Sequence, residues 1–232
     1  MPAVVVDTNV SLAATLSPFG MRRRFWIILA LGALTYEVEH RRLELDELSL
    51  SAEREGGIVH GVERALTRID EANHRRAALL ELLPYGTPDD WIAIGSAPLF
   101  DEYERKLEDV GQNIYPPLEK TDIPRLRRQM EVVCVAGAPP FDPDTVPALS
   151  PDRKDDPILH TALTSDAELL ISEDKHLVPD RQEQFWEHDD RTVTAMTFET
   201  LLTDRLDDVS WDEIEGSWLA VAHGQDYVPQ EY

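Results

Sequence analysis

Short runs of aliphatic residues, each ended by a polar or acidic residue, are the feature that most constrains the fold of this chain. The first run, Ala3–Val6, is followed at once by Asp7, and similar runs recur further along the chain. Fully buried parallel strands have this composition, because helices cover both faces of such a sheet. We expect strands over residues 3–6, 91–94, 132–135, 169–172 and 192–195.

Helical segments separate these runs. Ser96 and Pro98 suit the start of a helix, because serine caps a first turn and proline fits within it. The expected helices cover residues 11–16, 24–34, 96–107, 157–163 and 197–202. Strands that alternate with helices predict an α/β fold with a central parallel sheet.

A long segment, residues 35–88, lies between the second expected helix and the second expected strand of the 232-residue chain. Apolar residues recur in it at steps of three and four, which predicts an amphipathic helix. We therefore expect one domain over 1–203, with a core of 1–34 and 89–203 and a helical insert over 35–88, followed by an acidic extension over 204–232. The apolar stripe of the insert favours contact with a partner protein or with a second copy in a homodimer.

The formal net charge is −23, from 22 Lys and Arg against 45 Asp and Glu. This acidity argues against a general binder of duplex nucleic acid, which usually has a basic face. The segment 1–34 is the exception, because its three bases outnumber its single acid. Those bases, Arg22, Arg23 and Arg24, form either a phosphate-binding group or a solvated helix start. Further candidate bases are Arg125, Arg127, Arg128, Arg153 and Lys154.

Cysteine content and hydropathy indicate the cellular setting. Cys134 is the single cysteine, which excludes an intrachain disulfide, and its aliphatic neighbours predict a buried core position. The longest apolar stretch, 25–34, is about half as long as a membrane-spanning helix. The first residues also lack the basic start of a signal peptide. We therefore expect a cytoplasmic protein without membrane contact.

Acidic residues lie directly after expected strands or in the helices that follow them. Asp7 and Asp174 follow the first and fourth strands, Asp155 and Asp156 open a helix, and Glu102 lies in the helix after the second strand. The carboxyl ends of parallel strands form one edge of the sheet, where ligands bind. Two unit charges ~4 Å apart repel by about 4 kcal/mol at an effective dielectric near 20. A divalent cation would turn that repulsion into coordination, and all-oxygen ligands favour Mg²⁺ or Mn²⁺.

Each acid also has an ordinary structural explanation. Asp7 and Asp174 could form turns, and Asp155 or Asp156 could cap a helix. Glu102 has acidic neighbours and could belong to a solvated helix face.

Two further residues limit the alternatives. Asn9 stands where a haloacid-dehalogenase-type phosphatase needs a second aspartate, which argues against that chemistry. His176 belongs to no His-x-x-x-His pair and is expected to be structural or solvent-facing.

Four motifs, taken in order along the chain, resemble those of the PIN-domain family of nucleases. They are segment 4–10 around Asp7, segment 96–107 around Glu102, segment 152–162 around Asp155, and segment 167–177 around Asp174. The resemblance covers roughly 1–34 and 89–203 and is greatest to the branch that includes toxins of bacterial and archaeal toxin–antitoxin pairs. It implies a PIN-like α/β/α sandwich with a central parallel sheet.

The resemblance also implies a Mg²⁺- or Mn²⁺-dependent endoribonuclease that hydrolyses RNA phosphodiester bonds. The implied catalytic and metal-holding acids are Asp7, Glu102, Asp155 and Asp174. The polar groups beside them are Asn9, Ser172 and Asp156. The implied partners are an RNA substrate and, for the toxin branch, an antitoxin protein.

Two other functions stay open. A PIN-like binding or scaffold protein without catalysis would keep the acids as caps and would show no thermal shift with metal. A DNA nuclease of related fold would differ in its substrate, which a comparison of RNA and DNA digestion would decide.

Overall fold

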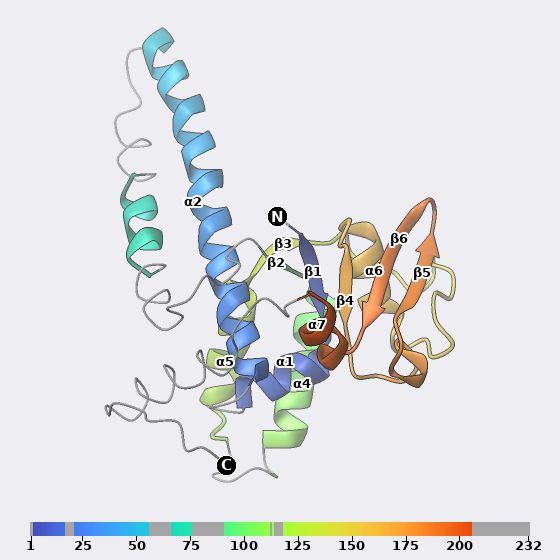
Figure 1. The fold of residues 1–232 in the computed structure, drawn as a ribbon. Coiled ribbons are helices and arrows are strands. Elements are labelled where there is room, and N and C mark those ends of the chain that lie inside the picture. Colours follow the sequence, from blue (N-terminus) through green and yellow to red (C-terminus); the bar gives the residue numbers. More distant parts are fainter. Residues whose placement is uncertain are drawn as a thin grey trace.

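A six-stranded sheet forms the centre of the molecule, with the strand order β3-β2-β1-β4-β6-β5 (Figure 1). The computed structural model describes residues 2–16, 21–55, 66–75, 91–111, 113 and 118–205. The five parallel strands are β1 (Ala3–Val6), β2 (Ile92–Gly95), β3 (Cys134–Gly137), β4 (Leu169–Ile171) and β6 (Arg191–Met196). β5 (Gln184–His188) pairs with β6 in the antiparallel direction. The predicted α/β fold with a mostly parallel central sheet is confirmed.

Helices flank this sheet. They are α1 (Thr8–Leu16), α2 (Met21–Glu55), α4 (Ala97–Gly111), α5 (Asp122–Val133), α6 (Asp156–Thr164), α7 (Phe198–Arg205), a helix over 66–75 and the short turn η1 (Pro179–Arg181). In Figure 1, α7 lies in front of the sheet and α6 behind it. The rings of Phe25 and Phe198 lie 5.5 Å apart, which joins α2 to α7 on the front face. The elements therefore form an α/β/α sandwich.

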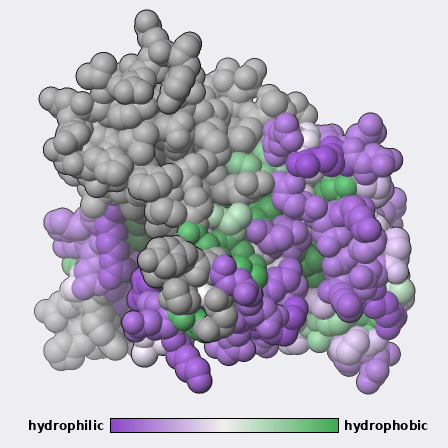
Figure 2. Space-filling view, turned by 90° about the horizontal axis from the view of Figure 1, so that it is seen from below, coloured by the Kyte–Doolittle hydropathy of each residue, from purple (hydrophilic) through white to green (hydrophobic). Residues whose placement is uncertain are grey.

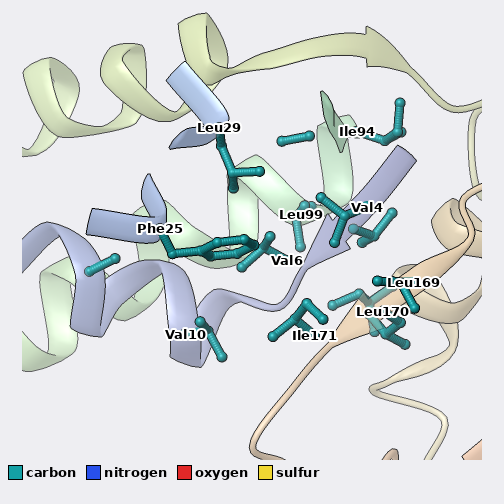
Figure 3. Packing of buried hydrophobic residues seen from close by; sticks show 14 of the residues in the cluster. Val4, Val6, Val10, Phe25, Leu29, Ile94, Leu99, Leu169, Leu170 and Ile171 are labelled. Carbon is teal, nitrogen blue, oxygen red and sulfur yellow. The ribbon is translucent and has the colours of Figure 1, made fainter. Parts of the chain in front are cut away.

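The core lies where β1 and β4 meet the first two helices. Figure 3 shows Val4 and Val6 of β1 close to Leu170 and Ile171 of β4, with Val10 and Phe25 beside them. Val4, Leu170 and Ile171 are completely buried. Burial of such a side chain stabilises the fold by about 1.5–3 kcal/mol. This packing explains why the run Ala3–Val6 carries no charged side chain.

The sequence does not predict α5 or β5, and the expected strand over 132–135 is displaced. Val132 and Val133 belong to the end of α5, and β3 begins only at Cys134. The prediction of a strand over 132–135 is therefore wrong by two residues. α5 buries Ile123 and Met130 in an amphipathic pattern.

β5 alternates half-buried and exposed residues and so lacks an aliphatic run. Its Phe185 is 68% exposed, whereas Trp186 donates its indole N–H to the carbonyl oxygen of Leu177 at 3.1 Å. The strand reverses direction through Asp189 and Asp190, both of which have positive φ. Two-residue hairpin turns require this backbone conformation, and aspartate tolerates it.

α2 continues without a break from the core into the segment expected as an insert. It covers 35 residues, which corresponds to about 50 Å at 1.5 Å per residue. Beyond the core, Leu34 and Val38 pack against Ile69 and Ala72 of the helix over 66–75. Figure 1 shows these two helices side by side, projecting away from the sheet. The division into core and insert stays a prediction.

Close packing fixes α2 to the beginning of β2. A Cβ atom placed on Gly32 would lie 1.7 Å from the carbonyl oxygen of Trp91, so only glycine fits at this crossing. Within the described ranges, no helix is long and apolar enough to span a membrane. The rest of the predicted amphipathic helix, including Ile58 and Leu83, and nearly all of the predicted extension lie outside the described residues.

Candidate metal centre

Asp7 stands at the carboxyl end of β1 and is 6% exposed. Its backbone N–H donates to the carbonyl oxygen of Ile171 at 2.9 Å, which holds it beside β4. Its Oδ2 accepts from the Ser172 hydroxyl at 2.5 Å and from the Asn9 amide at 2.8 Å. Burial raises the pKa of Asp7, against the lowering effect of the Ser172 hydrogen bond and of Lys106. The chain therefore holds this carboxylate in one orientation within a poorly solvated position.

Glu102 reaches the same edge from α4. The Thr8 hydroxyl lies 3.3 Å from its Oε1 and 3.2 Å from Oδ1 of Asp7, so it can donate to one of the two acids at a time. Lys106 contributes the positive charge here, because its Nζ lies 2.8 Å from Oε1 of Glu102 and donates to the Thr8 hydroxyl at 2.6 Å. Asp7 and Glu102 are therefore brought together, with an ammonium group beside them.

Asp155 lies in the turn before α6, and its side chain is 17% exposed. Its Oδ2 is buried and has no hydrogen-bond partner. Burial, followed by the negative charges of Asp174, Asp152 and Asp7, raises the pKa of Asp155 to about 6. Its side chain makes no capping hydrogen bond to α6. Asp155 thus occupies the N-cap position of α6 without using its carboxylate to cap the helix.

Asp174 follows β4 and faces the same region. The Ser172 hydroxyl, which donates to Asp7, accepts from the backbone N–H of Asp174 at 2.9 Å. The carboxylate of Asp174 accepts from the backbone N–H of His176 at 2.8 Å, and its carbonyl oxygen accepts from Leu177 and Val178. Asp174 therefore forms a turn, as its ordinary structural explanation predicts. Its side chain is 37% exposed.

His176 enters the cluster, although the sequence analysis expected it to be structural or solvent-facing. Its Nδ1 lies 3.3 Å from Oδ1 of Asp174, 3.8 Å from Oδ2 of Asp155 and 3.9 Å from Oδ2 of Asp152. One group of three possible metal ligands is found among the described residues. It consists of Asp152, Asp155 and His176, whose donor atoms all lie within 4.8 Å of one another. Asp174 contacts His176, and the charges of Asp7 and Asp174 act on Asp155, but Asp7, Glu102 and Asp174 do not join this group at that spacing.

The predicted metal-holding acids do not include Asp152 or His176, which the folded loops bring to this cluster. A turn hydrogen bond of 2.9 Å from the N–H of Asp155 to the carbonyl oxygen of Asp152 brings these two acids to one side. His176 lies two residues after Asp174 in a turn that folds back on itself. Neither spacing is a metal motif by itself, so recognising them requires the folded loop.

Asp156 has a different environment from its neighbour Asp155. It is 2% exposed, and its Oδ1 accepts from the backbone N–H of Leu149 and from both the N–H and the hydroxyl of Ser150. Arg153 lies 3.7 Å from its other oxygen. Asp156 therefore links the start of α6 to the preceding proline-rich loop, residues 138–155, which contains five prolines. This loop carries Asp152 and Asp155. The resemblance implies that Asp156 is a polar group beside the metal-holding acids. In the structure its carboxylate holds the loop that carries two of the acids.

The residues present fit a divalent cation. Several carboxylates converge at one sheet edge, one of them with a buried oxygen that lacks a hydrogen-bond donor. An unpaired buried carboxylate oxygen is costly, and a cation would satisfy it. The donor set of carboxylates and one imidazole suits ions such as Mg²⁺ and Mn²⁺. Figure 2 views the molecule from the side to which β1 points, and its coloured part shows mainly hydrophilic residues with apolar areas between them.

Most candidate bases are engaged with acids of the chain. Arg127 pairs with Asp101, Glu104 and Glu131, which joins α5 to α4. The other two bases of α5, Arg125 and Arg128, pair with acids of the same helix. Arg22, Arg23 and Arg24 lie in the first turn of α2, but their side chains lie outside the described part of the structure.

The fold and the acidic cluster define an α/β protein with a candidate divalent-metal centre at the carboxyl edge of a parallel sheet. A family model described as PIN domain matches residues 3–176, which is well over half of the chain. The chain therefore belongs to the PIN domain family, whose members are generally nucleases that use divalent metals. No curated protein and no solved structure matches it significantly.

Proposed function

We propose that this protein is a divalent-metal-dependent endoribonuclease that hydrolyses phosphodiester bonds in single-stranded or structured RNA. The observation that carries the proposal is the convergence of Asp7, Glu102, Asp155 and Asp174 on one sheet edge, with a buried oxygen of Asp155 lacking a donor. Membership of the PIN domain family supports the nuclease activity. The choice of RNA rests on the resemblance of the four motifs.

The residues of the chain would act mainly by positioning. Asn9 and Ser172 both donate to Oδ2 of Asp7, which fixes that carboxylate before any ligand binds. Asp155 offers its unpaired oxygen, and Lys106 places a positive charge beside Glu102. Asp7, Glu102, Asp155 and Asp174 would hold a divalent cation, which would supply stabilisation of the charge on the scissile phosphate and lower the pKa of a bound water.

The same charges make RNA binding depend on metal. Without a cation, the carboxylates at this edge repel a phosphodiester, and the bases of α5 are already paired with acids. We propose that Arg22, Arg23 and Arg24, in the segment 1–34 where bases outnumber acids, contact RNA phosphates. This role predicts that their substitution weakens RNA binding at all sequences alike.

The decisive test compares metal-dependent cleavage by the parent protein with that by Asp7→Asn and Asp174→Asn. Both variants remove a charge and keep the shape, so they should fold and lose RNA cleavage in Mn²⁺ or Mg²⁺. Asp144→Asn, an exposed acid in the proline-rich loop, is the matched control and should cleave normally. Cleavage by Asp7→Asn at the parent rate would refute the site. Preferential digestion of DNA would refute the RNA substrate.

We also propose, from the motif resemblance, that the protein is the toxin of a toxin–antitoxin pair and is inhibited by an antitoxin protein. Expression should then arrest growth, and Asp174→Asn should abolish the arrest at equal protein level. Unchanged growth with active parent protein would contradict the toxin role without affecting the nuclease activity.

A non-catalytic binding or scaffold function is the second candidate. The ion pair between Glu102 and Lys106 favours it, because that acid has a positive partner without any metal. This function predicts that Mn²⁺ leaves the melting temperature unchanged, whereas a cation that binds only the folded state must raise it.

A further inference from the structure

The side chain of His176 is placed differently from a histidine that simply faces solvent. Its ring nitrogen Nδ1 is surrounded by three carboxylates from two loops, those of Asp152, Asp155 and Asp174. Two of these acids lie in the loop before α6, and the third follows β4. The ring therefore lies between the loop before α6 and the turn after β4.

The spacing of these atoms suits ligands of one ion. Ligand atoms at about 2.1 Å from an octahedral cation are separated from their neighbours by about 3 Å, and opposite ligands by roughly 4.2 Å. The distances from Nδ1 to Oδ2 of Asp155 and of Asp152 are 3.8 Å and 3.9 Å. The three donor atoms lie within 4.8 Å of one another, so a small contraction brings them to ligand distance.

We propose that His176 Nδ1 is a metal ligand together with Asp155 and Asp152, and that it makes this centre select Mn²⁺ over Mg²⁺. This inference rests on the proposed metal-dependent function and deepens it by naming the ion and a ligand that the four predicted acids do not include. Imidazole nitrogen suits transition ions, whereas Mg²⁺ prefers oxygen ligands and keeps much of its water. One nitrogen donor therefore shifts the preference of an otherwise all-oxygen site.

The test measures binding and coordination directly. Titration calorimetry with MnCl₂ and with MgCl₂ should give at least tenfold tighter binding of Mn²⁺ by the parent protein. His176→Gln, which replaces the nitrogen by an amide, should weaken Mn²⁺ binding at least tenfold and change Mg²⁺ binding about twofold or less. Pulsed electron paramagnetic resonance of bound Mn²⁺ should show coupling to a ring nitrogen in the parent and none in the variant.

The control is His188→Gln, which also removes an imidazole beside an acid, since His188 Nε2 lies 3.3 Å from Asp189 on the β5–β6 hairpin. It should bind both ions like the parent. Mn²⁺ that binds without nitrogen coupling, or His176→Gln with unchanged selectivity, would overturn the proposal while leaving a metal-dependent nuclease intact. Absence of any binding of Mn²⁺ or Mg²⁺ would overturn both. His176 is 39% exposed, so the substitution should leave the fold unchanged, and the melting temperature without metal checks this.

Discussion

Asp155→Asn should stabilise the metal-free protein at alkaline pH. The carboxylate is buried beside three other acids, and its pKa is raised from the usual 3.8 to about 6. The folded state therefore holds the proton up to a higher pH than the unfolded chain does. Because of this, the ionised carboxylate progressively lowers stability as the pH rises from about 4 to above 6. An amide carries no charge and avoids this cost.

The magnitude follows from the two pKa values. At about 1.4 kcal/mol per pKa unit, the difference between 3.8 and about 6 corresponds to about 3 kcal/mol at pH 8. The side chain is 17% exposed, so screening by solvent reduces the expected gain to about 2 kcal/mol. A change of this size raises the melting temperature of a chain of this length by about 4–8 °C.

Urea and thermal unfolding in a chelator measure this gain. At pH 8 the variant should exceed the parent by about 2 kcal/mol, and at pH 4.5 most of the difference should vanish. Asp144→Asn, which removes an exposed charge, should change stability at both pH values by less than about 0.5 kcal/mol. Addition of Mn²⁺ should reverse the order, since the cation stabilises the parent more than the variant. A variant that is less stable than the parent at pH 8, or equally stabilised at pH 4.5, would refute the description of Asp155 as an unpaired buried acid.

Three further predictions concern packing and assembly. Gly32→Ala should lower the free energy of unfolding by about 2–3 kcal/mol in urea titration, because the added methyl group would overlap the backbone of Trp91. An unchanged unfolding midpoint would contradict the close crossing of α2 and Trp91. Asp156→Ala should cost about 3–5 kcal/mol by the same assay, since it leaves donors of Ser150 without their buried acceptor. Deletion of residues 37–86 should lower the molar mass per particle in light scattering if this segment mediates a homodimer, and an unchanged monomer mass in both proteins would argue against that role.

The parts of the fold that the sequence predicts well are those in which local composition and tertiary environment agree. The run Ala3–Val6 is aliphatic because both faces of β1 are covered, and Leu169–Ile171 follows the same rule. β5 could not be predicted from periodicity, because it pairs at the edge of the sheet and leaves Phe185 in solvent. The predicted strand includes Val132 and Val133, because they continue an aliphatic run as far as Val135. In the structure they end α5, and Val132 is 56% exposed.

The candidate site divides in a similar way. Asp7 and Asp174 can be placed from the sequence, because an acid within three residues of the end of a buried parallel strand lies near the carboxyl edge of the sheet. Asp155 and Asp156 are adjacent in sequence and equally acidic, and only the folded loop distinguishes them. One carboxylate accepts hydrogen bonds from Ser150, whereas the other has an oxygen without any donor. The position of His176 depends on two loops meeting, which no local spacing encodes.

The continuity of α2 has a mechanical consequence. One unbroken helix carries Phe25 in the core, crosses β2 at Gly32 and ends at Glu55 beyond the sheet. Because the projecting part of α2 is the same helix that packs in the core, no flexible loop separates the two parts. A load applied near its far end would therefore bear on the crossing at Trp91 and on the contact between Phe25 and Phe198, next to the strands that carry the acids.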